Sequence, residues 1–185
     1  MGLQIESGTG SGKQAGVTDD NKLRTYSTTE SEISYESETN GQSYIWSAYV
    51  APPADDNVIW LRNDSTTQNL IIEQIIIGSL LTSVQEIFIG TGTAANGAGY
   101  ATVTGVNLNA KSGKVALATC NSENGNADAG GSATLSSTHF VPATGTIVLD
   151  VKGSIILGYL DEISINTLTN TTVAASIVGY YHEAE

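Results

Sequence analysis

The sequence contains little cysteine, little basic charge and no long run of uncharged apolar residues. Its one cysteine, Cys120, cannot form an internal disulfide, so side-chain packing must hold the fold together. Seven basic residues stand against nineteen acidic residues, and the formal charge of −12 repels phosphate groups and anionic lipid head groups. We therefore expect neither a nucleic-acid partner nor a membrane partner.

The most apolar stretch, residues 70–89, lacks the pattern of a membrane span. A span needs about 20 nearly uncharged residues. This stretch carries Glu73 and Glu86, and Gly78 and Ser79 divide it in two. It predicts two adjacent buried strands.

The sequence is also poor in catalytic motifs. Its only histidines, His139 and His182, have no GxSxG elbow beside them, so we do not expect a nucleophilic triad. Residues 7–14, SGTGSGKQ, imitate a phosphate-binding loop, but Ser7 and Gln14 break its pattern and no buried strand precedes it. We expect a non-enzymatic chain with no catalytic residues and no cofactor.

Two sets of polar residues leave alternatives open. Paired carboxylates can serve a glycosidase on a β-sandwich, but the spacing in this sequence selects no pair. The candidates are Glu73, Glu86, Asp150, Asp161 and Glu162. The residues around Gly125 resemble a loose set of oxygen ligands for calcium, although Asn and Asp are also typical of turns. They are Asn121, Glu123, Asn126 and Asp128, where we expect turns and no metal.

From residue 43 onward, short segments rich in β-branched and aromatic residues alternate with turn signals such as Pro52-Pro53. Apolar residues recur at every second position, as in Ile147, Leu149 and Val151. The candidate strands are residues 43–50, 57–63, 70–78, 84–90, 101–107, 114–119, 133–140, 145–152, 154–160, 163–168 and 172–181. This pattern predicts an all-β fold, an antiparallel β-sandwich of jelly-roll type over residues 43–185.

Two tryptophans lie inside these apolar segments. Trp46 and Trp60 can form a sugar-stacking platform on a lectin-like sandwich, or they can pack in the core. Because both lie in otherwise apolar strands, the sequence favours core packing.

Residues 1–42 differ from the rest because they are rich in Gly, Ser, Thr and acidic residues and poor in clustered apolar side chains. They predict an extended N-terminal arm, which gains order from a partner. Its isolated larger side chains are the candidate assembly interface. We name Val17, Leu23, Arg24, Tyr26 and Ile33.

Three segments of the chain together resemble tailed-bacteriophage virion structural proteins. The first is the glycine-rich start GTGSGKQAGV at residues 8–17, followed by NKLRTYS at residues 21–27. The other two are LIIEQIIIG at residues 70–78 and SIVGYYH at residues 176–182.

The resemblance implies a capsid decoration or cement protein with a jelly-roll body and an arm that laces neighbouring subunits. It implies the major capsid protein or other virion proteins as partners, a homo-oligomer (trimer or dimer), and a place in the virion after assembly in the bacterial host cytoplasm. The alternative function is a carbohydrate- or receptor-binding module of a phage tail or fibre, and a β-sandwich glycosidase is a third hypothesis.

Overall fold

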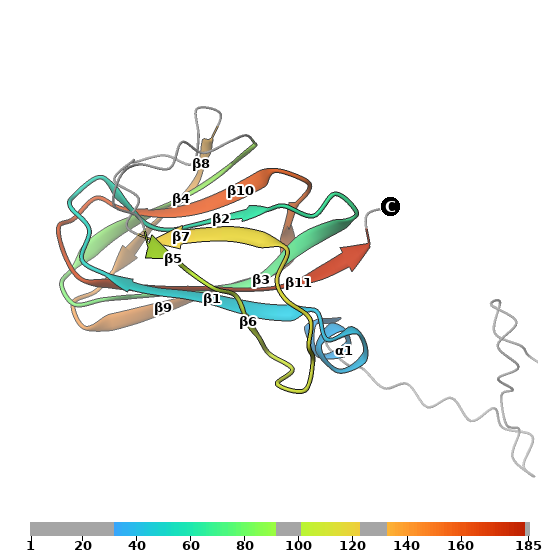
Figure 1. Ribbon diagram of the computed structural model, residues 1–185. Coiled ribbons are helices and arrows are strands. Elements are labelled where there is room, and N and C mark those ends of the chain that lie inside the picture. Colours follow the sequence, from blue (N-terminus) through green and yellow to red (C-terminus); the bar gives the residue numbers. More distant parts are fainter. Residues whose placement is uncertain (1–31, 92–100, 123–132, 184–185) are drawn as a thin grey trace, which may run out of the picture. The chain divides into compact units, whose positions relative to one another are not determined.

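The computed structural model describes residues 32–91, 101–122 and 133–183 (Figure 1). Contacts within the chain separate two units, Met1–Ser31 and Glu32–Glu185. All the helices and strands described below belong to the second unit.

A short helical segment precedes the strands, and it consists of α1 (Glu32–Tyr35) and one π-helical turn, η1 (Glu36–Asn40). The strands are β1 (Ser43–Val50), β2 (Asp56–Asn63), β3 (Gln68–Ser79), β4 (Ser83–Thr91), β5 (Ala101–Thr102), β6 (Val106–Asn107), β7 (Ala118–Ser122), β8 (Thr134–Val141), β9 (Gly145–Leu157), β10 (Asp161–Thr167) and β11 (Val173–Glu183).

The strands form two antiparallel sheets that stack on each other, and the two layers are visible in Figure 1. The five-stranded sheet has the order β6-β1-β11-β3-β9, and the six-stranded sheet has the order β5-β7-β2-β10-β4-β8. Strands β1 to β4 alternate between the sheets, and β8 to β11 do the same. This is the double Greek-key order of a jelly roll, so the predicted fold class is confirmed.

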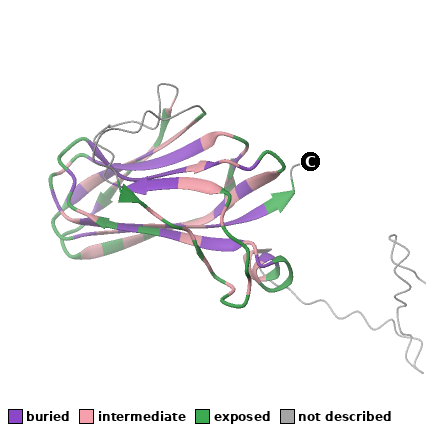
Figure 2. Cartoon of the chain, viewed as in Figure 1, coloured by how far each residue is buried: buried purple, intermediate pink, exposed green. Residues whose placement is uncertain are grey.

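The core lies between the two sheets and is built from alternate residues of the long strands (Figure 2). Trp46, Ile75 and Ile177 of the five-stranded sheet are fully buried, as are Ile59 and Ile163 of the other sheet. Each such side chain contributes about 1.5–3 kcal/mol of burial free energy. The core position predicted for Trp46 is therefore confirmed.

Residues 145–157 form one strand, β9, where the sequence predicts two strands divided at Gly153. Lys152 and Gly153 have positive φ angles of 48° and 73°, and the pairing with β3 shifts register between Ile72 and Gln74. The expected break is therefore a bulge, which bends a strand without ending it.

The predicted strand at residues 101–107 is divided into β5 and β6, which belong to different sheets. Gly105 lies at the crossing, where a Cβ atom would be 2.5 Å from Nε1 of Trp46. The predicted strand at residues 114–119 is also wrong in its bounds, because pairing with β2 begins only at Ala118. Val115 is 76% exposed.

Residues 32–42, the last part of the predicted extended arm, form a helical segment over residues 32–40 and a two-residue link, and they are bonded to the sandwich. Gly41 adopts the left-handed conformation that ends η1, with φ of 61°. Its carbonyl accepts from Asn107 Nδ2 at 2.8 Å and from Ser112 Oγ at 3.0 Å, and Asn109 Nδ2 donates to Ser37 O at 2.7 Å.

We expect this helical segment to stabilise the sandwich. A chain that begins at Ser43 should unfold in urea with a free energy about 3 kcal/mol lower than a chain that begins at Glu32, since it loses these three hydrogen bonds and each contributes about 1 kcal/mol. Equal free energies of unfolding for the two truncated chains would show that the segment has no such role.

Candidate functional site

The outer face of the five-stranded sheet carries many large apolar side chains among a few polar ones. In an antiparallel pair, directly opposed residues share a face. Ile76 lies directly opposite Ser176 on one neighbouring strand and Val148 on the other. Ile45 lies directly opposite Val178 on one side and Val106 on the other. We define the apolar face by the larger apolar side chains that lie on it. They are Ile45, Tyr49, Ile71, Ile76, Val106, Val148, Ile156 and Val178.

Half of the side chains that define this apolar face are exposed to solvent, and the face carries almost no charge. Tyr49 is 77% exposed, Val106 61% and Val148 55%. The charges that border it are Asp150 and Lys152 of β9, whose Oδ2 and Nζ atoms lie 3.7 Å apart, and Glu73 at the β3 bulge. An exposed apolar patch of this kind is typical of an interaction surface.

One end of the sandwich carries a second feature, which we call the end cleft. It consists of two adjoining hollows of about 380 and 270 Å³, which share Gln42, Gln68, Lys114 and Tyr181 in their walls. Tyr44 lines the smaller hollow, and its ring meets that of Tyr181 edge-on at 5.7 Å. Burial raises the pKa of both tyrosines, so these hydroxyls stay neutral.

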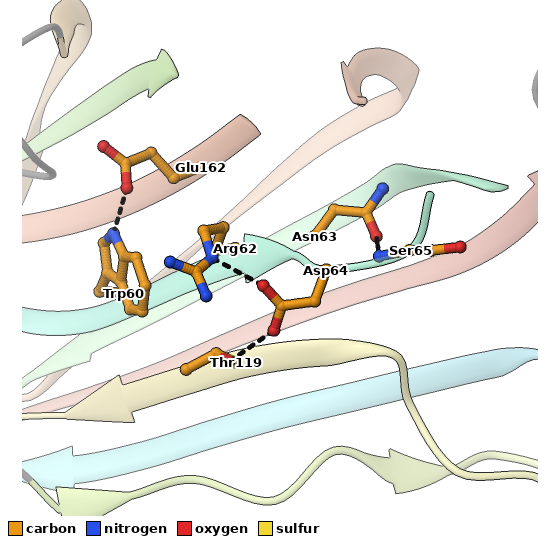
Figure 3. A network of polar contacts seen from close by, with 7 residues as sticks. All are labelled: Trp60, Arg62, Asn63, Asp64, Ser65, Thr119 and Glu162. Atoms are coloured by element: carbon orange, nitrogen blue, oxygen red, sulfur yellow. Dashed lines mark hydrogen bonds and ion pairs between the residues drawn. The ribbon is translucent and has the colours of Figure 1, made fainter. Parts of the chain in front are cut away.

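The outer face of the six-stranded sheet carries a polar network (Figure 3). Trp60 Nε1 donates to Glu162 Oε2 at 2.9 Å, while Arg62 lies over the indole at 5.5 Å. Arg62 Nε also pairs with Asp64 Oδ1 at 2.7 Å, and Thr119 Oγ1 donates to the other oxygen of Asp64 at 2.5 Å. Trp60 is therefore buried as predicted, but against this network and not in the core between the sheets.

Glu162 is the most unusual titratable group of this network. Its side chain is buried and its Oε1 atom has no hydrogen-bond partner. Burial raises the pKa of its carboxyl above the ordinary value, although the Trp60 hydrogen bond and the Arg62 guanidinium oppose the rise. The buried Ser164 and Asn166, two and four residues further along β10, also have oxygen atoms without a partner.

The structure distributes the five carboxylates considered for a glycosidase over both sheets. Glu73 and Asp150 belong to the five-stranded sheet, and Asp161 Oδ2 accepts from the Gly158 amide at 2.8 Å in a turn. Glu86 of β4 lies directly opposite Asn166 of β10, which is four residues further along β10 than Glu162. At 3.3 Å per residue, Glu86 is therefore about 13 Å from Glu162 along the strand direction. Glycosidase pairs lie about 5–10 Å apart, so this face offers no matched pair.

Of the predicted interface residues, only Ile33 lies within the described part of the chain, where it is half-buried in α1. Val17, Leu23, Arg24 and Tyr26 lie outside the described residues.

The other sequence candidates show ordinary structural contacts. His139 Nε2 lies 2.9 Å from Ser137 Oγ, and His182 Nδ1 lies 3.1 Å from the Glu183 carbonyl. Cys120 is buried in β7, and burial raises the pKa of its thiol.

Of the calcium candidates, Glu123, Asn126 and Asp128 lie outside the described residues. Within residues 32–91, 101–122 and 133–183, no group of three His, Cys, Asp or Glu side chains is placed to hold a metal. None of the helices in these same ranges is long and apolar enough to cross a membrane.

No protein family, curated protein or solved structure matches this chain. Function must therefore be argued from the apolar face, the end cleft and the polar network. Sequence reasoning did not foresee the apolar face, although a signal for it exists. Ile75, Ile76 and Ile77 are consecutive, and a continuous apolar run indicates a strand with apolar side chains on both of its faces.

Glu162 makes a pH-dependent contribution to stability that can be measured. Because its folded pKa is raised above 4.5, the folded state holds a proton that the unfolded state has lost, so stability falls as pH rises through the folded pKa. Glu162→Gln keeps an oxygen atom that can accept the hydrogen bond from Trp60, and it removes the loss of stability that comes from ionisation of the carboxyl group. The free energy of unfolding in urea should therefore rise for the variant relative to the natural chain as pH rises from about 4 to 7.

The same substitution at the partly exposed Glu86 controls for the removal of one negative charge. A constant stability difference between Glu162→Gln and the natural chain across this pH range would contradict the assignment.

Proposed function

We propose that this chain is a structural component of a bacteriophage virion, a capsid decoration or cement protein that acts as a homo-oligomer. The jelly-roll sandwich and the resemblance of its N-terminal segments support this proposal, but a fold alone does not define a function. The observation that carries the proposal is the apolar face, because a surface of this kind gains free energy when another surface covers it.

A second copy of this chain can cover the apolar face, because this face is the part of the surface where like charge opposes self-association least. The chain has a formal charge of −12, and two copies therefore repel each other over most of their surface. The apolar face has only Glu73, Asp150 and Lys152 at its border, so two copies can approach there without burying unpaired charge at its centre.

The size of the apolar face suits such a contact. The sheet has five strands at about 4.8 Å spacing, and all of them except the short β6 have at least eight residues. At 3.3 Å per residue, the face therefore measures roughly 24 by 26 Å, on the order of 600 Å². Because side chains project from the sheet, the accessible surface is larger than this flat area. A stable interface buries about 800 Å² on each partner, so the apolar face is close to the area that a dimer needs.

A two-fold contact between identical faces produces a closed dimer in which two sheets pack about 10 Å apart. Each dimer then carries two copies of residues 1–31, with Val17, Leu23, Arg24 and Tyr26 as the proposed contacts to the major capsid protein or another virion protein. Two linked arms bind more tightly than one, because the second arm binds at a high effective concentration.

A charge introduced on the apolar face, on its edge strand β9, should break the dimer. Val148 lies opposite Ile76 and is 55% exposed, so Val148→Glu should fold normally and weaken self-association at least tenfold, since dimerisation would bury an unpaired carboxylate. Sedimentation equilibrium measures the change. The variant should also attach more weakly to virions.

Leu81→Glu is the matched control, since Leu81 is 54% exposed in the turn between β3 and β4. This control should behave as the natural chain does. A natural chain that stays monomeric, or a Val148→Glu chain that dimerises as well as the Leu81→Glu chain, would exclude the apolar face as the self-association surface.

A further inference from the structure

The end cleft is formed by four segments that are distant in the sequence. They are the helical segment with Tyr35 and Glu36, the start of β3 at Gln68, the loop around Lys114, and the end of β11 at Tyr181. None of these residues takes part in the apolar face. The end cleft is therefore free for a role of its own.

Hydrogen bonds fix the walls of this cleft. Asn107 Nδ2 donates both to the Gly41 carbonyl at 2.8 Å and to the Lys114 carbonyl at 3.1 Å, so it ties the loop to the helical segment. The backbone of Gln42 is held on both sides, because its backbone N–H donates to the Glu36 carbonyl at 3.1 Å and its backbone carbonyl accepts from the Tyr181 N–H at 3.0 Å. A pre-formed site of this kind loses little conformational entropy on binding.

The cleft combines an apolar wall in its smaller hollow with an exposed aromatic ring in its larger hollow. Tyr44, Val115, Leu117 and Tyr181 line the smaller hollow, and Tyr35 lines the larger hollow with 49% of its surface exposed. An accessible aromatic ring beside an apolar wall suits the flat, weakly polar faces of a sugar ring.

Two amides supply the directional contacts. Gln68 Nε2 donates to Gln42 Oε1 at 2.8 Å. This bond uses one oxygen and one nitrogen, so the pair retains one amide nitrogen as donor and one amide oxygen as acceptor. A donor beside an acceptor matches two neighbouring hydroxyls, each of which can donate and accept.

The charges around the cleft disfavour an anionic ligand. Glu36 and Glu183 line the larger hollow with Lys114 as the cation, and the Glu36 carboxylate is buried and accepts from Asn40 Nδ2 at 2.6 Å. The rest of the chain adds to the negative potential. A carboxylated or phosphorylated sugar would be repelled, whereas a neutral one would not.

We propose that the end cleft binds a neutral saccharide of one or two sugar units, with Tyr35 stacking on a ring and the Gln42–Gln68 pair binding neighbouring hydroxyls. The combined hollow matches the roughly 300–1,000 Å³ of ordinary small-ligand sites. This activity is independent of self-association through the apolar face.

The test is a binding titration of the full-length chain, by ligand-observed NMR and calorimetry, with maltotriose, cellotriose and the trimer of N-acetylglucosamine. N-acetylneuraminic acid is the anionic comparison. At least one neutral trisaccharide should bind at millimolar concentration or below, and the anionic sugar should not bind.

Variants locate the binding site. Tyr35→Ala and Gln68→Ala should each weaken binding about tenfold, since each removes one contact of the ordinary strength. Tyr159→Ala and Gln74→Ala remove the same residue types from positions outside the cleft walls and outside the defined apolar face, and they should leave binding unchanged. Tyr35→Phe keeps the ring and should retain binding.

All variants are compared after thermal unfolding has shown that they fold as the natural chain does, and partly exposed positions such as these tolerate truncation. Failure of all three neutral trisaccharides to bind would overturn the proposal. Binding that survives both Tyr35→Ala and Gln68→Ala would overturn the location, and tighter binding of N-acetylneuraminic acid would overturn the neutral class.

Discussion

The burial of alternate apolar residues between the two sheets is the interaction on which the rest of the structure depends. With no disulfide available, Trp46, Ile75 and Ile163 and their neighbours must supply the free energy that offsets chain ordering. Their inward positions fix which residues face outward, because side chains alternate along a strand. The apolar face and the polar network therefore both follow from the register of the core.

The two sheets have similar apolar inner faces, but their outer faces differ in polarity. On the six-stranded sheet, the outward residues of β10 are Glu162, Ser164 and Asn166, which are polar and buried. On the five-stranded sheet, the outward residues include Ile76 and Val148 beside the polar Ser176 and Gln74, so this sheet has large apolar side chains on both sides. A sheet with apolar side chains on both faces leaves burial unfinished in a single sandwich, and we propose that a second copy of the chain completes it.

The sequence predicted the fold class well because strand alternation is a local signal, and β1 matches its predicted bounds of Ser43–Val50. It failed where long-range pairing decides the outcome. The bulge at Gly153 has the same local signature as a strand end, and the division at Gly105 depends on the approach of Trp46. The end cleft was beyond sequence reasoning because its walls meet only in the folded chain.

The most direct test of the central claim, that the apolar face joins two copies, is a distance measured between spin labels on the assembled protein. The natural Cys120 is buried, so a cysteine at the exposed Thr146 on the border of the apolar face can be labelled selectively. Two faces about 24 Å wide that pack about 10 Å apart should bring the two labels within about 40 Å of each other. The account predicts a defined distance in that range, and the absence of any dipolar coupling between copies would contradict it.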